Sequence, residues 1–313
     1  MSVPTRPLGS TGIDVSIIGV GGGHICRKHI TEETTVRIIQ RAVDEGVTFI
    51  DTAWEYHGGE SERRMGIALQ KRREKAVIMT KVCSRGRDEA LEQLDESLKR
   101  LKTDYIDVWQ FHEINYDNDA DWLFAQDGAV EAAIKARDAG KVRCIGFTGH
   151  KSPHILQTML EQDFAWDTCQ LPVNVLDYHY RSFQRQMLPQ LVDRGIGVIG
   201  MKSLGGDAQL ITGAGLTAEQ CRRYALSLPI SVLVCGMESE ENLEQDLAVA
   251  RDFEAYDEAE MARLREQVMP VAKDGRFEWF KSTQFYDSQT HRDQHGFPPI
   301  GSVGQPPADK ETS

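Results

Sequence analysis

The 313-residue sequence predicts a (β/α)8 barrel, an α/β fold in which eight parallel strands alternate with helices. Short β-branched and aromatic runs alternate with amphipathic helical segments along most of the chain. These runs begin at intervals of roughly 25–35 residues, which is the length of one strand–helix unit. Because eight such runs follow one another, a closed barrel is favoured over an open sheet.

The predicted strands are apolar segments bounded by turn residues. The run Val47-Thr48-Phe49-Ile50, for example, has the composition of a strand that is buried on both faces of a parallel sheet. In chain order, the predicted strands are residues 17–20, 47–50, 76–80, 105–111, 142–147, 167–171, 196–200 and 230–235.

Helices are predicted between the strands from the spacing of apolar residues. Val36, Ile39 and Val43 recur at the spacing of one helix face, and a leucine repeat marks a later helix at positions 91, 94, 98 and 101. Three helices end in the same pattern, an aspartate followed two residues later by a glycine, at 44–46, 138–140 and 193–195. Glycine in that position is a typical C-terminal stop.

The two ends of the chain lie outside the repeat. Residues 6–15 contain a Gly-rich turn between two extended segments, which predicts a hairpin that closes the bottom of the barrel. The period stops after about residue 272; residues 277–297 are rich in aromatics, and residues from Pro298 onward have a disordered composition. We therefore expect a barrel domain over residues 1–272, with its N-terminal hairpin, and a C-terminal extension over 273–313. The extension begins with a candidate substrate loop.

Composition narrows the class of partner. The net charge is −12 and the chain has no long basic run, which argues against nucleic acid or an anionic membrane as partner. No apolar run approaches the ~20 residues of a membrane span, and the first ten residues lack a signal-peptide pattern. The six cysteines contain no C-x-x-C pair, as expected for reduced thiols in a cytoplasmic protein.

A glycine cluster, Gly21-Gly22-Gly23, follows the first predicted strand. It resembles the start of a dinucleotide-binding fingerprint, but His24 occupies the place of the third glycine. The next strand also lacks an acidic residue at the ribose-binding spacing. We therefore reject a dinucleotide-binding sheet, although the cluster still permits a ligand to approach the backbone closely.

Four polar residues, Asp51, Tyr56, Lys81 and His112, stand at or just after the ends of three successive predicted strands. In a parallel barrel those ends meet at one rim. An ammonium beside a tyrosine favours the phenolate and so makes the hydroxyl a better acid, and a carboxylate would hold the ammonium in place. A histidine nearby could orient a carbonyl oxygen or share the proton. The set suits carbonyl reduction, for which the hydride must come from a cofactor.

These residues bring the chain close to a known family. The segment Phe49-Ile50-Asp51-Thr52-Ala53 with Tyr56 and Glu60, followed by Thr80-Lys81-Val82 and His112, resembles the aldo-keto reductase superfamily over about residues 5–270. The resemblance implies a (β/α)8 barrel, an NADPH or NADH cofactor, and a catalytic tetrad at Asp51, Tyr56, Lys81 and His112. The runs at 148–150 and 201–206 resemble a branch that often carries a C-terminal iron–sulfur cysteine cluster, which is missing here because the last cysteine is Cys235.

The resemblance also implies a set of cofactor-binding residues. Gln170 matches the amide-binding glutamine of the family, Thr148 replaces the serine of a Ser-Asn pair whose asparagine is missing, and Met201 replaces an aromatic that stacks on the nicotinamide. The full set is Gly22, Thr148, Gln170, Met201, Lys202, Leu204, Gly206, Gly236, Glu238, Asn242 and Gln245.

The preference between NADP(H) and NAD(H) is expected to depend on the loop after the eighth strand. NADPH-binding members usually place a basic residue there, but no Lys or Arg occurs from Tyr224 to Ala250. Glu238 would instead suit ribose hydroxyls. The sequence therefore favours NAD(H) slightly.

The substrate and two alternative functions stay open at this point. His24, Trp54 and Tyr116 are expected to border a pocket for a small carbonyl or alcohol substrate. One alternative is a metal-dependent hydrolase or isomerase that would use rim residues His24, Asp51, His112, Glu113 and His150, although Lys81 beside Asp51 counts against it. The other alternative is a regulatory subunit that binds cofactor without turnover. We predict no metal ligands, and the sequence does not indicate an oligomeric state.

Overall fold

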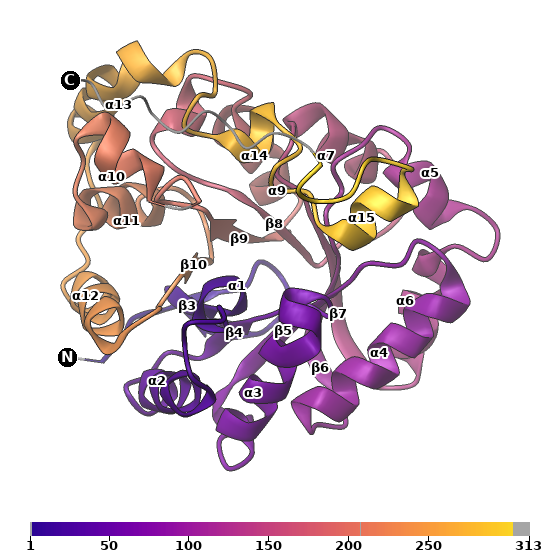
Figure 1. The fold of residues 1–313 in the computed structure, drawn as a ribbon. Helices are drawn as coiled ribbons and strands as arrows, with labels where there is room; N and C mark the ends of the chain where they lie inside the picture. The colour runs from indigo at the N-terminus through magenta and orange to yellow at the C-terminus, as the bar shows by residue number, and fades with distance from the viewer. Residues whose placement is uncertain (1, 207, 303–313) are drawn as a thin grey trace.

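Eight parallel strands close into a barrel in the computed structural model, which describes residues 2–206 and 208–302 (Figure 1). The order around the barrel is β10-β3-β4-β5-β6-β7-β8-β9, and every predicted strand overlaps one of these. The predicted (β/α)8 fold is therefore confirmed. The strands are β3 (Ile18–Gly21), β4 (Phe49–Asp51), β5 (Val77–Val82), β6 (Ile106–Phe111), β7 (Val142–Thr148), β8 (Thr168–Pro172), β9 (Gly197–Met201) and β10 (Val232–Cys235).

Helices surround the barrel and cover the outer faces of its strands (Figure 1). Two of the predicted stops, Gly46 and Gly140, have φ angles of 99° and 73°, a conformation that residues with a Cβ rarely adopt. The longer helices are α2 (Glu32–Asp44), α3 (Glu60–Leu69), α4 (Arg87–Leu101), α6 (Ala129–Asp138), α7 (Pro153–Leu160), α11 (Ala218–Leu226), α12 (Glu240–Arg251) and α13 (Glu258–Ala272). Shorter ones are α1 (Gly22–Ile25), α5 (Asp119–Phe124), α8 (Phe183–Gln186), α9 (Leu188–Asp193) and α10 (Gln209–Ala214), with 3-10 turns η1 (Tyr56–Gly59), η2 (Arg73–Lys75) and η3 (Leu176–Tyr178).

The predicted N-terminal hairpin closes one end of the barrel. Strands β1 (Thr5–Pro7) and β2 (Asp14–Ser16) pair antiparallel, and Leu8 in the connecting turn is fully buried. Leu8 belongs to a separate apolar cluster with barrel residues that include Phe49, Met79, Val108 and Ile199. Because this end is filled with apolar side chains, polar chemistry is confined to the opposite end, where the strands terminate.

The C-terminal extension lies over that opposite end. After α13 the chain forms two short helices, α14 (Trp279–Ser282) and α15 (Gln289–Gln294), drawn in yellow in Figure 1. The sequence showed no period here because both helices are short and their few buried residues include the charged Lys281 and Arg292. The predicted disordered tail falls mostly on residues 303–313, which lie outside the described residues. Within the described residues, no helix combines the length and the apolar character of a membrane span.

Substitution of Leu8 by alanine tests the role of the hairpin. We expect a loss of about 2–5 kcal/mol of unfolding free energy because a fully buried leucine leaves a cavity among fixed strands. Chemical denaturation monitored by circular dichroism measures the loss. The matched control is Met269→Ala on α13, whose side chain is 40% exposed and should cost under about 0.5 kcal/mol. Equal stability of the two variants would contradict the sealing role.

Candidate active site

Two adjoining cavities, of about 390 Å³ and about 530 Å³, open at the carboxyl ends of the barrel strands. The smaller one extends toward β9, β10 and α12, and the larger one extends toward the loops after β4 and β6 and the C-terminal extension. Tyr56, Met201 and Lys202 are among the residues that line both cavities, so these residues lie at the junction. The smaller and the larger cavity therefore form one continuous cleft.

Lys81 and Asp51 form a buried ion pair at the top of β5 and β4. Lys81 Nζ also donates to the Thr52 carbonyl at 2.7 Å and lies 3.5 Å from the Tyr56 hydroxyl oxygen. The second oxygen of Asp51 accepts from Gln170 Nε2 at 3.1 Å. Adjacent parallel strands thus bring the predicted Asp, Lys and Tyr side chains together at one rim.

Tyr56 is turned into the mouth by an unusual loop. The next residues, His57, Gly58 and Gly59, have φ angles of 55°, 66° and 86°, so the chain makes a left-handed turn directly after the tyrosine. Burial, followed by the charges of Asp51 and Glu55, raises the pKa of Tyr56 well above its usual value. The net shift is therefore upward rather than the lowering expected from Lys81, because burial dominates and Asp51 already pairs with the ammonium. Tyr56 keeps its proton at neutral pH and can donate it.

His112, directly after β6, completes the set. Its ring meets the Tyr56 ring edge-on, with 5.5 Å between centroids, and its Nδ1 lies 3.0 Å from Glu55 Oε1. Burial lowers the pKa of His112, against an opposing effect from Glu55, so the imidazole is neutral. All four residues of the predicted tetrad therefore gather at the junction of the cavities.

Two carboxyl groups beside His112 were not predicted as members of a reductase site. Burial would raise the pKa of Glu55, but the His112 contact lowers it overall. Burial and then the charge of Glu55 raise the pKa of Glu113 to about 8, and its Oε2 accepts from the Ser288 backbone N–H at 3.1 Å. A sequence signal existed for Glu55, an acidic residue immediately before Tyr56, but nothing in the sequence showed that it reaches the ring of His112.

Most residues of the implied cofactor set line the cleft. The smaller cavity is bordered by Met201, Lys202, Leu204, Gly206, Gly236, Glu238, Asn242 and Gln245, and the larger one by Thr148 and Gln170. Gly22 is the exception. A Cβ there would lie 2.5 Å from Ser61 Oγ and 2.8 Å from the Asp51 carbonyl, so Gly22 permits close packing against α3. Its neighbours Gly21 and Gly23 border the cleft instead.

The charge around Glu238 also differs from the expectation. Its carboxylate contacts three basic side chains, Arg27 at 2.9 Å, His24 at 2.8 Å and His29 at 3.4 Å. These residues lie after the first barrel strand, more than 200 residues away in sequence. The lack of Lys and Arg between residues 224 and 250 therefore did not predict the charge of the cleft. The basic residues come from a loop that is far away in the sequence but close in space.

One atom in the cleft, Gln170 Oε1, is suited to bind the nicotinamide group of a dinucleotide. Gln170 Oε1 is buried and has no hydrogen-bond partner among the described residues, and Gln170 and Thr148 border the same chamber. An acceptor in that state suits the N–H groups of a carboxamide. At the far end, the Ser239-capped N-terminus of α12 carries Asn242 and Gln245 on the cleft wall. Gln170 would hold the nicotinamide amide, and these α12 residues would hold the adenosine half.

Of the three predicted substrate residues, only His24 borders the cleft. Neither Trp54 nor Tyr116 appears on the described walls of the two cavities. The Trp54 indole N–H donates to Glu96 on α4 at 2.7 Å, and the Tyr116 hydroxyl donates to Asp287 at 2.5 Å. The sequence placed both residues after strands correctly, but it did not reveal which way the side chains turn.

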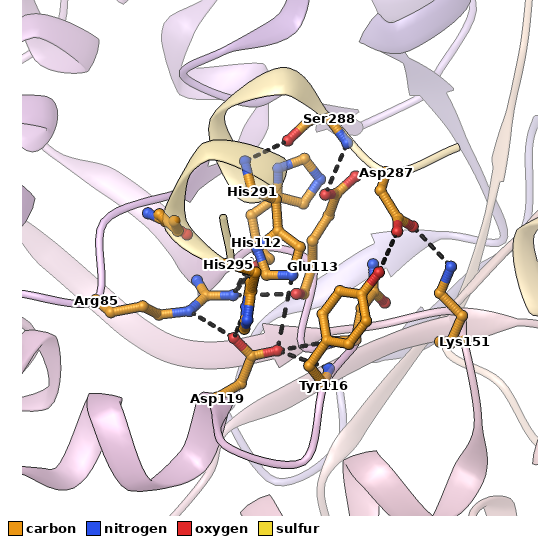
Figure 2. Close-up of polar contacts among 12 residues, drawn as sticks. Arg85, His112, Glu113, Tyr116, Asp119, Lys151, Asp287, Ser288, His291 and His295 are labelled. Carbon is orange, nitrogen blue, oxygen red and sulfur yellow. Dashed lines mark hydrogen bonds and ion pairs between the residues drawn. The ribbon is translucent and has the colours of Figure 1, made fainter. Parts of the chain in front are cut away.

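The C-terminal extension supplies one wall of the larger cavity through Tyr286, Ser288, Gln289, Thr290 and Ile300. Figure 2 shows how polar contacts fasten this segment to the barrel loops. Asp287 accepts from Lys151 at 2.8 Å as well as from Tyr116, and His295 lies 3.3 Å from Asp119. Burial would raise the pKa of Asp287, but His150, Lys151 and Tyr116 lower it overall. The extension is thus held by buried charges from loops after β6 and β7.

The five rim residues suggested for a metal site do not form a cluster among the described residues. Two other groups have the required proximity, Glu55–Cys83–His112 and Asp119–His291–His295. In the first, Glu55 Oε1 and His112 Nδ1 already contact each other at 3.0 Å. In the second, the Arg85 guanidinium bonds Asp119 at 3.1 Å and lies 3.4 Å from His291 Nδ1 (Figure 2). The members of each group therefore already have polar partners within the protein.

Comparison with known proteins gives matches along most of the chain. Aldo-keto reductase YhdN of Bacillus subtilis (strain 168) is 31% identical over 218 residues, covering 63% of this chain and 61% of that protein. L-galactose dehydrogenase of Arabidopsis thaliana is 26% identical over 310 residues, covering 86% and 95%. The NADH-specific methylglyoxal reductase of Escherichia coli (strain K12) is 28% identical over 218 residues, covering 61% and 64%. The chain thus matches less than two thirds of the length of two of these relatives.

Solved structures and a family model agree on the fold. The holo form of aldo-keto reductase AKR11C1 from Bacillus halodurans superposes with a TM-score of 0.70 at 21% identity, covering 87% of this chain and 97% of that one. A model of the aldo/keto reductase family matches residues 17–222, which extend from the first barrel strand to α11. This chain therefore belongs to the aldo/keto reductase family.

Proposed function

We propose that this protein is an NAD(P)(H)-dependent oxidoreductase that reduces an aldehyde or ketone, or oxidises the corresponding alcohol. One observation carries the proposal. Tyr56, with a protonated hydroxyl, meets the Lys81–Asp51 pair and His112 at the junction of two cavities. The smaller cavity suits the adenosine half of a dinucleotide, and the larger cavity suits the nicotinamide beside Gln170 together with a small substrate whose carbonyl reaches Tyr56.

Each side chain of the site has a separate role in the proposed reaction. A bound nicotinamide supplies the hydride for the carbonyl carbon. Tyr56 donates its proton to the carbonyl oxygen, and Lys81, 3.5 Å from the hydroxyl, stabilises the phenolate that the transfer leaves. Asp51 holds Lys81 in place and is itself oriented by Gln170. The C-terminal wall limits the access of water to this point.

The proposal includes a preference for NADH. Glu238 borders the adenosine end of the cleft, where its carboxylate is suited to ribose hydroxyls and repels a 2′-phosphate. It also pairs with Arg27 and contacts His24, the basic side chains that a phosphate at this end would approach. The name of the NADH-specific Escherichia coli relative is consistent with this preference.

The proposal also places the protein in the cytoplasm. All six cysteines are buried free thiols, as expected for a reducing compartment. The partner we propose is a small carbonyl or alcohol compound. A cofactor-binding regulatory subunit would instead bind NADH without turnover on aldehydes, sugars or hydroxysteroids, and the wild-type assay distinguishes the two.

Replacement of Tyr56 by phenylalanine tests the proton donor. We expect kcat to fall by roughly 10²–10⁴, the usual contribution of general acid catalysis, while cofactor affinity stays near that of the wild type. Steady-state kinetics and quenching of tryptophan fluorescence by NADH measure the two quantities. Tyr105→Phe, at the opposite end of β6, is the control and should keep full activity. Full activity of the Tyr56→Phe variant would contradict the assignment of Tyr56 as the proton donor.

Replacement of Glu238 by glutamine tests the cofactor preference. The wild type is expected to have a lower KM for NADH than for NADPH. In the variant, Arg27 and His24 lose their carboxylate partner, so the preference should move toward NADPH on the order of tenfold, or about 1.4 kcal/mol. Glu241→Gln, an exposed position in the first turn of α12, three residues after Glu238, serves as the control. A wild type that clearly prefers NADPH contradicts the assignment.

Replacement of Asp287 by asparagine tests the extension that begins at Lys273 as a substrate wall. The variant loses the charge that Lys151 and Tyr116 hold, so the segment should become cleavable in limited proteolysis. We expect the substrate KM to rise at least about threefold while cofactor affinity changes little. Asp293→Asn, exposed on the same segment, is the matched control. Unchanged substrate kinetics together with new cleavage would separate the extension from the active site.

A further inference from the structure

Glu55 is a buried carboxylate at the mouth to which the proposed chemistry assigns no role. Its side chain is 11% exposed and that of His112 is 8% exposed, and Oε1 lies 3.0 Å from Nδ1 of the ring. The Lys81 ammonium is already paired with Asp51. Glu55 is therefore directed at the imidazole rather than at the ammonium.

This contact determines which ring nitrogen of His112 carries the proton. An ionised carboxylate only accepts hydrogen bonds, so the Nδ1 beside it must be the N–H donor. A neutral imidazole has one N–H, which leaves Nε2 with a free lone pair. Nε2 can then accept a proton but cannot donate one to a carbonyl oxygen. Of the two roles that the sequence left open for His112, the contact favours sharing a proton.

We propose that Glu55 is a positioning residue that forms a carboxylate–imidazole pair with His112, so that Nε2 receives the proton released when the substrate alcohol is oxidised. This inference rests on the proposed function. Glu55 touches neither substrate nor cofactor in this scheme; it fixes the tautomer of the ring and stabilises the imidazolium that forms. The His112 and Tyr56 rings meet edge-on, with 5.5 Å between their centroids, so the two side chains are direct neighbours.

The proton and electron balance is closed within the proposed reaction. In oxidation, the carbon-bound hydrogen leaves as hydride to the oxidised nicotinamide, and the alcohol hydroxyl proton passes to the Tyr56 oxygen. The proton of Tyr56 moves to His112 Nε2, which leaves a carbonyl product and an imidazolium–carboxylate pair. In reduction, Tyr56 donates its proton to the carbonyl oxygen, and the imidazolium returns a proton to the phenolate that Lys81 stabilises.

The groups that surround the pair do not offer an equivalent partner for Nδ1. The Cys83 thiol lies 3.8 Å from Nδ1, and burial raises its pKa well above the usual value, so it is a neutral thiol. Glu113 is turned toward the extension, where it accepts from the Ser288 N–H. The titratable and charged groups around Glu55 and His112 are Asp51, Tyr56, Lys81, Cys83, Arg85 and Glu113, from β4, β5 and the loops after β4, β5 and β6. Among the described residues, the 3.0 Å contact with His112 Nδ1 is made by Glu55 and by none of these groups.

Glu55→Gln is the first test, measured as the pH profile of alcohol oxidation by the full-length protein with saturating cofactor. Oxidation needs neutral His112, and the carboxylate raises the pKa of the ring by stabilising the imidazolium. Its removal should therefore move the acid limb of kcat to lower pH by about one unit or more. It should also lower the plateau at least about tenfold, as expected when a carboxylate no longer orients a catalytic imidazole. The substrate KM should change little.

The control is Glu96→Gln, which removes the carboxylate that bonds Trp54, the neighbour of Glu55. It should keep the wild-type pH profile. A Glu55→Gln enzyme with the wild-type plateau and acid limb overturns the pair while the proposed function stands. A wild-type protein without any NAD(P)-dependent turnover overturns the proposed function itself, so the two failures are distinguishable.

A second measurement does not depend on how the variant folds. Nitrogen-15 NMR of the histidine-labelled wild-type protein with bound NAD⁺ reads the tautomer of His112 directly, assigned by comparison with His112→Asn. We expect the proton on Nδ1 and a bare Nε2 at neutral pH. Observation of the opposite tautomer, with the proton on Nε2, overturns the proposal.

Discussion

The buried ion pair between Lys81 and Asp51 is the interaction on which the barrel mouth depends. Lys81 is 1% exposed, and an ammonium so far from water is tolerated only with a charge partner and further acceptors. Asp51 supplies the charge, the Thr52 carbonyl supplies an acceptor, and Gln170 orients the second oxygen of Asp51. The need to satisfy one buried charge thus brings β4, β5 and β8 into a single polar site beside Tyr56.

The same constraint shapes the C-terminal wall. Lys281 on α14 is fully buried and pairs with Asp177 at 2.7 Å and with Glu278 at 2.9 Å. Burial raises the pKa of Glu278 to about 7, against the opposing effect of Lys281. Asp287 is buried in the same way against Lys151. Because each charge must keep its partner, the extension is held to loops far away in sequence and forms a defined wall.

Much of the site could be predicted from the sequence, and the errors have a common cause. Residues at strand ends, such as Asp51 and Lys81, are placed by topology alone, because parallel barrel strands end at one rim. Trp54 and Tyr116 also follow strands, yet their side chains turn to Glu96 and Asp287, and strand ends do not encode side-chain direction. Figure 2 shows Tyr116 pointing to the extension, a segment for which the sequence had no period.

The sequence by itself determined the barrel, its closing hairpin, and the order in which the four polar residues appear, because these features follow from local periodicity and the punctuation of helices by glycine. Only the tertiary structure decided the charge of the cleft and the partner of the His112 ring. Arg27 meets Glu238 across more than 200 residues, and Glu55 reaches a ring that stands after another strand. Burial and Coulomb interactions depend on distance in space, which the linear spacing of residues does not contain.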